Sequence, residues 1–278
     1  MTITMIRKPI STQGLVYEVT EITPEVARAW LDKNVKNRKL SARRVAAFAR
    51  DIKNNAWRFT GDAIRFDVNG NLLDGQHRLR ACIEAGKPFT SLVLYKLPTE
   101  SRDFIDLGAP RSPADVLMLN GHVNTIKLAA AARTLLMLRS GHQSESGFDR
   151  VTTHEIMACL KKHPLLPHSI LKCHACLGIS TSLLAVVHYI GAVILEKRSR
   201  ADAFVKVWTT GQPDYDGDPA HILRERLLRE KGSATGLKRD ERYRLLFHTW
   251  NAFAKKKPVE LLRPPKELVI DGLDPKSL

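Results

Sequence analysis

Almost all of the β-strand signals in this chain of 278 residues lie before residue 98. Residues 16–22 and 64–70 alternate apolar and polar side chains, as strands with one buried face do, and the second segment ends in a hairpin-forming Asn-Gly pair. Residues 89–97 are nearly continuous in apolar side chains, which is typical of an interior strand. After Gly121 the periodicity is almost entirely helical. The pattern therefore predicts an α+β N-terminal domain followed by an all-α C-terminal domain.

Capping signals place the starts of several helices. Thr23 precedes Pro24 at a first helical position, and Ser41 precedes a second amphipathic segment. Thr152 and Glu155 have the spacing of a capping box. Beyond the central motif, helices are predicted at residues 113–120, 126–138, 152–162, 165–177, 180–197, 199–208, 219–231 and 238–255.

The predicted elements divide the chain into three parts. Residues 1–14 lack periodicity, and we expect them to form a flexible arm. Residues 15–121 are expected to form a small mixed sheet with helices, and residues 122–278 a helical domain. A hydrophobic content of 44% is sufficient for a core in a chain of this length.

The chain carries a formal net charge of +15, which favours polyanionic partners. One short segment concentrates basic residues without any acidic residue between them, whereas the later basic groups are diluted by Asp and Glu. The candidates for a nucleic-acid surface in this segment are Lys33, Lys36, Arg38, Lys39, Arg43 and Arg44. A solvated helix face is the alternative interpretation of the same pattern. DNA is the partner that we expect.

Polar residues gather where the alternating segment gives way to a helical one, in the sequence Asp74-Gly75-Gln76-His77-Arg78. The start of a helix has backbone N–H groups without intrahelical partners, and Gly75 allows a ligand to approach closely. Arg78 can supply a two-pronged donor to an anion, and Asp74 can supply a carboxylate for a proton or a metal. An ordinary Asp-Gly turn is the alternative, but the density of polar residues favours a phosphate site.

Residues 74–81, with the sequence Asp-Gly-Gln-His-Arg-Leu-Arg-Ala, resemble the phosphate-binding signature of the ParB/sulfiredoxin superfamily. The resemblance covers about residues 15 to 120 and is nearest to phage and prophage proteins that join a DGQHR domain to a helical C-terminal region. Gln76 stands where sulfiredoxins have a reactive cysteine, so sulfinic-acid reduction is not expected. Gln76 and His77 also replace residues of the partition proteins, whose second nucleotide motif has no counterpart here, so their CTP switch is not carried over.

The resemblance implies a nucleotide- or phosphate-binding protein that acts on or near DNA. The phosphate-binding candidates are Gly75, Gln76, Arg78 and Arg80, and the catalytic candidates are Asp74, His77 and Arg78. NTP hydrolysis or phosphoryl transfer would fit, because this chemistry depends mainly on positioning and charge, and a nucleoside triphosphate with Mg²⁺ is the cofactor to test. Whether the protein is an enzyme stays open at this point.

Two other functions remain in consideration. A DNA-binding or regulatory module without turnover would bind DNA with a steep salt dependence. A metal-dependent nuclease would need a second carboxylate beside Asp74, which Asp62, Asp67 or Asp106 could supply. Asp106 and Arg111 are second-tier site candidates, because they lie in a Gly/Pro-rich loop that returns toward the predicted sheet.

The remaining signals concern metals, membranes and location. Cys159, His163, Cys173 and Cys176 could form a zinc site, but their helical spacing favours core packing, and no metal ligands are assigned. The apolar stretch at residues 183–195 is too short to span a bilayer. Without a disulfide pattern or a leader, we expect a protein of the bacterial or phage-infected cytoplasm, without a membrane partner and with a homodimer left open.

Overall fold

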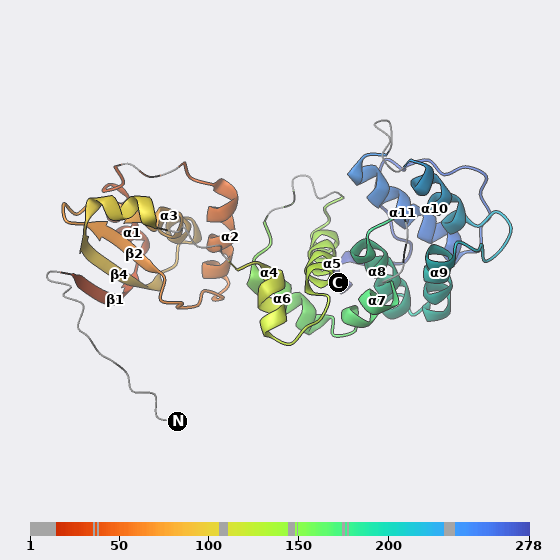
Figure 1. The fold of residues 1–278 in the computed structure, drawn as a ribbon, viewed down its shortest axis with the longest axis horizontal. Helices are drawn as coiled ribbons and strands as arrows, with labels where there is room; N and C mark the ends of the chain where they lie inside the picture. The colour runs from red at the N-terminus through yellow and green to blue at the C-terminus, as the bar shows by residue number, and fades with distance from the viewer. Residues whose placement is uncertain are drawn as a thin grey trace, which may run out of the picture. The chain divides into compact units, whose positions relative to one another are not determined.

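The computed structural model describes residues 15–35, 37, 39–105, 111–143, 148, 150–173, 176, 178–230 and 237–278. The chain divides into two compact units, Met1–Pro110 and Arg111–Leu278 (Figure 1). The division precedes the helix Pro113–Leu119 (α4), whereas the sequence pattern placed the boundary after that helix. The predicted arm at residues 1–14 and the site candidates Lys36, Arg38 and Asp106 lie outside the described residues.

The first unit contains a mixed sheet of four described strands in the order β1-β4-β2-β3. Their bounds are β1 (Val16–Ile22), β2 (Ala63–Asp67), β3 (Leu72–Asp74) and β4 (Phe89–Leu97). β1 pairs antiparallel with β4, β2 pairs antiparallel with β3, and β2 lies parallel to β4. The predicted strands at residues 16–22 and 89–97 are confirmed, as is the broad α+β class.

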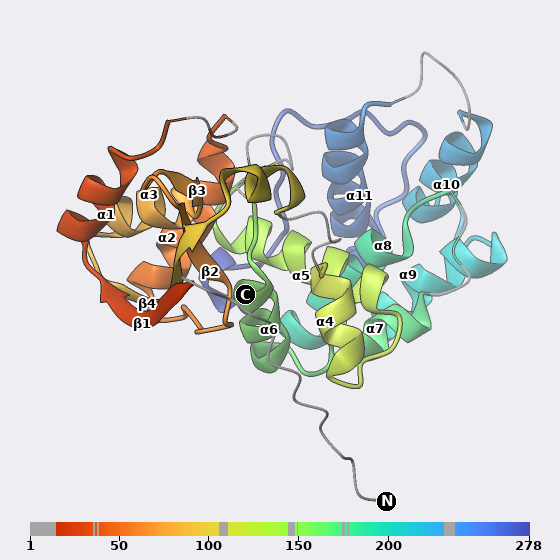
Figure 2. The same ribbon diagram turned by 60° about the vertical axis from the view of Figure 1, so that its left-hand side comes forward.

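Helices α1 (Pro24–Leu31), α2 (Ala42–Lys53) and α3 (Gln76–Ala85) share one core with this sheet (Figure 2). The sheet contributes alternate side chains, including Ile64 and Val93, and α3 contributes Leu79. Both predicted caps are present: Thr23 Oγ1 accepts from the N–H of Val26, and Ser41 Oγ accepts from the N–H of Arg44. A short 3₁₀ helix, η1 (Thr99–Phe104), follows β4.

All the regular secondary structure in the described part of the second unit is helical. Its elements are α4, α5 (Thr125–Arg139), α6 (Thr153–Lys162), α7 (Leu166–Lys172), α8 (Thr181–Tyr189), η2 (Ile190–Ile194), α9 (Arg198–Thr210), α10 (Pro219–Arg229), α11 (Arg239–Ala254) and η3 (Pro275–Ser277). The Thr152–Glu155 capping box is confirmed. Trp208, Trp250 and Phe253 are fully buried in its core.

One predicted helix, at residues 180–197, has a more complex form. It begins as α8 and continues as a π-helical turn, η2, after Tyr189. A Cβ atom added to Gly191 in this turn would lie 2.6 Å from the ring of Trp250, so the turn depends on a residue without a side chain. Gly191 therefore lets η2 lie directly against the ring of Trp250 on α11.

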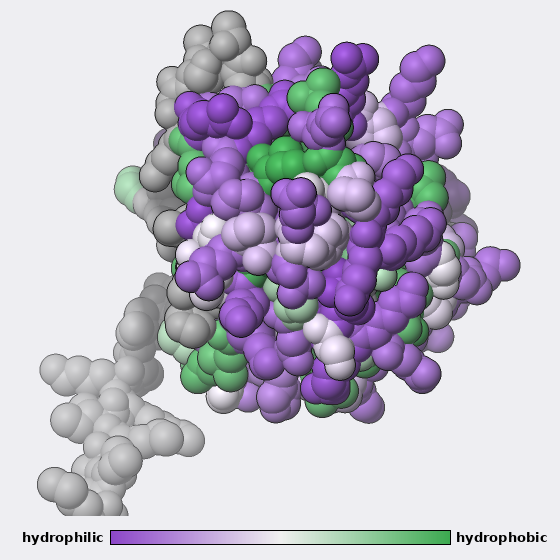
Figure 3. Space-filling view, turned by 90° about the vertical axis from the view of Figure 1, so that its right-hand side faces the viewer, coloured by the Kyte–Doolittle hydropathy of each residue, from purple (hydrophilic) through white to green (hydrophobic). Residues whose placement is uncertain are grey.

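Hydrophilic side chains cover most of the face drawn in Figure 3, and apolar side chains form only small areas on it. Within the described ranges, none of the helices combines the length and the apolar character required to cross a bilayer.

Candidate functional site

Gly75 forms the junction between β3 and α3. Its φ angle of +112° lies in the left-handed region that favours glycine. A Cβ atom at this position would also collide with the side chain of Ile64 on β2. Its carbonyl accepts the helical hydrogen bond from Leu79 N at 3.0 Å. The tight turn therefore requires glycine and directs residues 76–78 into the first turn of the helix.

The described residues of the basic segment, residues 33–44, are attached to β3 and to the first turn of α3 by hydrogen bonds that include the following four. Two involve Leu72: its N–H donates to the carbonyl of Lys33 at 2.9 Å, and its carbonyl accepts from Asn37 Nδ2 at 2.8 Å. The other two involve motif side chains, since Asn34 Nδ2 donates to Gln76 Oε1 at 3.1 Å and Ser41 N donates to His77 Nε2 at 3.0 Å. The two groups of residues that the sequence singled out separately are therefore in direct contact.

Gln76 and His77 are buried, with exposed fractions of 5% and 7%. The contact with Ser41 requires an unprotonated Nε2, so the neutral imidazole carries its proton on Nδ1. In this arrangement both side chains orient the basic segment, and neither is presented openly to solvent. The phosphate-binding role expected of Gln76 and the catalytic role expected of His77 stay predictions.

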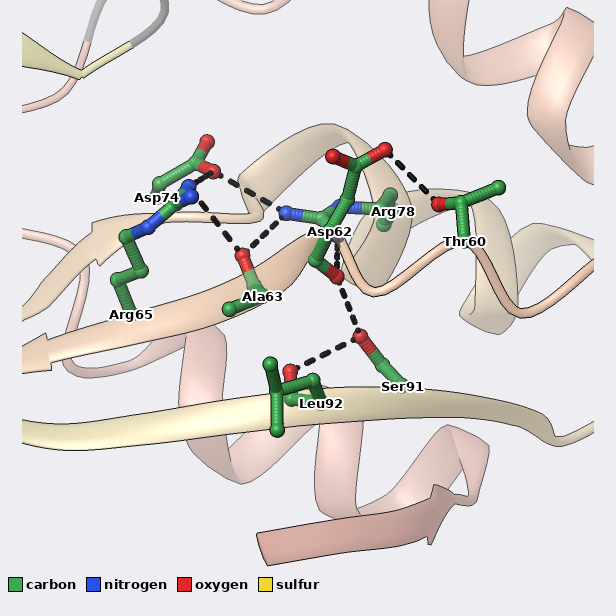
Figure 4. A network of polar contacts seen from close by, with 8 residues as sticks. All are labelled: Thr60, Asp62, Ala63, Arg65, Asp74, Arg78, Ser91 and Leu92. Atoms are coloured by element: carbon green, nitrogen blue, oxygen red, sulfur yellow. Dashed lines mark hydrogen bonds and ion pairs between the residues drawn. The ribbon is translucent and has the colours of Figure 1, made fainter. Parts of the chain in front are cut away.

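Arg78 is the centre of a second network on the β2 side of the helix (Figure 4). Its Nη1 donates to the carbonyl of Asp62 at 2.7 Å, and its Nη2 donates to the carbonyl of Ala63 at 2.6 Å and to Asp74 Oδ2 at 3.1 Å. Arg65 Nη1 also donates to Asp74 Oδ2, at 2.8 Å. The Asp74 carboxylate thus lies between two guanidinium groups, and Arg78 fixes the position of α3 against the start of β2.

The other carboxylates named for a metal pair have contacts of their own. Asp62 Oδ2 accepts from Thr60 Oγ1 at 2.9 Å. Asp67 is only 2% exposed and accepts from the N–H groups of Asn69 and Asn71 and from Thr99 Oγ1. Burial acts to raise the pKa of Asp67, but these hydrogen bonds outweigh burial and lower the pKa below its ordinary value. Among the described residues there is no group of three or more His, Cys, Asp or Glu side chains that could hold a metal ion.

The described cations of the basic segment differ in exposure. Lys33, Lys39 and Arg43 are exposed, and Arg44 is half-buried in the first turn of α2. Lys33 Nζ lies 5.8 Å from the centre of the Phe66 ring. Arg80, on the outward face of α3, is also exposed. Arg111 is exposed as well and belongs to the second unit.

The cysteine and histidine residues considered for zinc lie within the second unit. Cys159 and Cys173 are buried, and burial raises the pKa of Cys159 to about 11. Cys159 Sγ contacts the carbonyl of Ala132, and His163 Nδ1 lies 2.9 Å from Tyr189 Oη. Cys176 Sγ contacts Thr181 Oγ1 at 3.7 Å. These contacts are those of polar atoms satisfied within a helical core.

The sequence did not identify Arg65 as the second ion-pair partner of Asp74. It also did not identify the residues of the basic segment that donate hydrogen bonds to Leu72, Gln76 and His77, which are Asn34, Asn37 and Ser41. Arg65 was visible only as a polar residue in an alternating strand, and the asparagines only as polar residues among lysines. Together, these features describe an α+β protein with a cluster of polar and cationic side chains around the start of α3. Comparison of the chain with protein-family models, curated proteins and solved structures finds no match.

Proposed function

We propose that the first unit is a phosphate-binding module, similar to ParB-type domains, that binds the backbone of DNA through its basic segment. The observation that carries this proposal is the attachment of the described part of residues 33–44 to Leu72 at the start of β3 and to Gln76 and His77 in the first turn of α3. A segment that is held in place loses less conformational entropy on binding than a free loop does. The network around Arg78 gives the same turn a fixed position against the sheet.

The charges of the segment provide the affinity in this proposal. Lys33, Lys39 and Arg43 are exposed and have no carboxylate among their sequence neighbours from residue 33 to residue 44. Each cation that neutralises a phosphate releases condensed counterions, so the logarithm of the affinity falls with the logarithm of the salt concentration by about 0.9 per contact. Because contacts to phosphate carry no base information, we expect little sequence preference from this segment.

A nucleotide is the second candidate ligand, which the resemblance of residues 74–81 suggests, although Gly75 itself is buried and its missing side chain makes room for Ile64. Arg80, exposed on the turn after the strand-to-helix junction, is the side chain that would contact a terminal phosphate. NTP hydrolysis or phosphoryl transfer would then depend on Mg²⁺ brought with the nucleotide. In this alternative Arg78 and Asp74 shape the turn through their mutual ion pair.

The first experiment measures DNA binding by fluorescence anisotropy over a range of salt concentrations. We expect the wild-type chain to bind duplex DNA and the Lys39→Ala/Arg43→Ala variant to bind it more weakly, with a salt slope smaller by about two. Lys161→Ala/Lys206→Ala, which removes two exposed lysines from helices of the second unit, is the matched control and should have little effect. Equal affinities for all three proteins would contradict the proposal.

The second experiment measures thermal stability with ATP, ADP and CTP in the presence of Mg²⁺. A nucleotide that binds the folded state raises the melting temperature, and Arg80→Ala should abolish the rise if the site is at α3. If no nucleotide raises it, DNA binding stands alone as the proposed function. Metal-dependent DNA cleavage that disappears in Asp74→Asn would instead establish the nuclease alternative.

A further inference from the structure

Residues 55–62 form a loop that connects α2 to β2 and is anchored at both ends. At its start, the N–H groups of Ala56 and Trp57 donate to the carbonyl of Asp51, which lies in the last turn of α2, two residues before the helix ends at Lys53. The Trp57 ring packs edge-on against Phe48 and Phe89, and its Nε1 donates to the carbonyl of Thr90 at 3.2 Å. This end of the loop is therefore part of the core.

The other end of the loop is fixed by Arg78. The carbonyl of Asp62 accepts from Arg78 Nη1 at 2.7 Å and from Ser91 Oγ at 3.2 Å, and the Asp62 carboxylate accepts from Thr60 (Figure 4). The same first turn of α3 thus holds the basic segment through Gln76 and His77 and this loop through Arg78. Two surface segments that are distant in sequence are positioned by one helical turn.

Between these anchors, the loop exposes an aromatic ring among polar residues. Phe59 is 52% exposed, and its neighbours Arg58, Thr60 and Gly61 are exposed as well. The guanidinium of Arg58 donates to the carbonyls of Asn55 and Trp57, so the positive charge is held within the loop. Phe59 is one of several exposed large apolar side chains, and it differs from the others in lying next to Arg58 in a loop whose end is fixed by Arg78.

We infer that Phe59 is a stacking platform for an unpaired base of single-stranded DNA whose phosphates contact the basic segment; this inference rests on the proposed function. Aromatic rings beside cationic side chains are the usual means of binding single strands, because every base offers a flat face to stack on. Arg58 adds a cation next to the ring, which complements the negative charge of the strand.

The spacing of the two contact regions suits this ligand. The basic segment ends in the first turn of α2, and the loop begins just after its last turn, so the 12 residues of the helix separate them by about 18 Å at a rise of 1.5 Å per residue. A strand with stacked bases, at about 3.4 Å per step, covers this length in about five nucleotides, and a more extended strand covers it in fewer. A short single strand can therefore contact the cations at one end of α2 and Phe59 at the other.

The test compares fluorescein-labelled oligo(dT) of about 20 nucleotides with a duplex of equal length, by fluorescence anisotropy at constant salt. In Phe59→Leu we expect the affinity for oligo(dT) to fall about tenfold, because leucine keeps an apolar side chain but cannot stack, while the affinity for the duplex stays within about twofold. Phe104→Leu, which replaces a phenylalanine that is 73% exposed in η1, is the matched control and should change neither affinity.

The outcomes separate this inference from the proposed function. If the wild-type chain binds both probes, Lys39→Ala/Arg43→Ala weakens both and Phe59→Leu weakens neither, the stacking inference is wrong and the phosphate-binding proposal stands. If Phe59→Leu weakens the two probes equally, the ring does not distinguish an unpaired base and the inference is again wrong. If the wild-type chain binds neither probe, both are wrong. A melting temperature of Phe59→Leu equal to that of the wild type confirms that the variant is folded.

Discussion

The N–H of Ser41 donates to Nε2 of His77 across a sequence separation of 36 residues. This bond joins the N-cap residue of α2 to the first turn of α3. It needs Nε2 as an acceptor, and in a protonated imidazole both ring nitrogens are donors. The position of the basic segment therefore depends on a buried side chain of the central motif.

Replacement of His77 by alanine should loosen this attachment. We expect a loss of roughly 1–3 kcal/mol in the free energy of unfolding, because a buried ring and its hydrogen bond are both removed. DNA affinity should fall several-fold, because the segment must then be ordered on binding. Urea denaturation and anisotropy measure the two effects. His154→Ala, at an exposed position on α6, is the control, and a His77→Ala variant with unchanged DNA affinity would mean that the attachment does not serve binding.

Arg78→Lys should destabilise the first unit although it keeps the positive charge. A single ammonium group cannot reproduce the geometry in which two guanidinium nitrogens contact the carbonyls of Asp62 and Ala63 and the Asp74 carboxylate. We expect a loss of about 2–4 kcal/mol in urea denaturation, because the abandoned acceptors are partly buried. Arg80→Lys on the exposed face of the same helix should be nearly neutral. Equal stability of the two variants would contradict the structural role assigned to Arg78.

Gly75→Ala should be more destabilising than Gly70→Ala. Both positions have positive φ angles, +112° and +80°, so both substitutions carry backbone strain of about 1–3 kcal/mol. At Gly70 there are no atoms within 4 Å of the added methyl group, whereas at Gly75 it collides with Ile64. Combining Gly75→Ala with Ile64→Val, which removes the colliding Cδ1 atom, should recover part of the loss. The unfolding free energies of these variants test this order directly.

Two buried histidines of the second unit should make stability depend on pH. His188 contacts Ser169 Oγ through Nδ1 and Asp202 Oδ1 through Nε2, and His163 contacts Tyr189. Burial lowers the pKa of His188 below 6.5 even though Asp202 acts to raise it, and Lys172 and Arg198 add to the lowering. Burial also lowers the pKa of His163, with contributions from the nearby Lys162 and Arg139.

The direction of the pH effect follows from these shifts. Below pH 6.5 the unfolded chain takes up protons that the folded chain does not, so the stabilisation is complete above pH 6.5 and is lost progressively as the pH falls toward the lowered values. The melting temperature should therefore decline on acidification from about pH 8 to pH 5.5, and a His163→Gln/His188→Gln variant should show a smaller decline. His248→Gln, at an exposed position, should retain the wild-type profile. A double variant with the full decline would contradict this explanation.

Local signals predicted much of this fold. The strands at residues 16–22 and 89–97 and the caps at Thr23, Ser41 and Thr152 are determined by neighbouring residues, so a single sequence contains the information. The π-helical turn after Tyr189 depends on Gly191 meeting Trp250, which lies far along the chain, and the predicted continuous helix therefore did not include it.

The candidate site was predictable in its residues but not in its contacts. The turn at Gly75 and the density of cations at residues 33–44 are visible in the sequence. The pairing of Asp74 with Arg65, and the use of Gln76 and His77 to hold Asn34 and Ser41, depend on how strands and helices come together. The hydrophobic periodicity of a sequence cannot predict such contacts, because it describes single elements and each contact joins two different elements.

The pairing of β1 with β4 also has a consequence for biosynthesis. Val16 pairs with Tyr95 and Ile22 with Phe89, so β1 cannot pair within the sheet until β4 has been synthesised. Until residue 97 has left the ribosome, the backbone N–H and C=O groups of β1 lack the partners that β4 provides. We therefore expect ribosome-bound chains that stop before β4 to bind chaperones. Chains that include β4 should bind them less, because the sheet can then form.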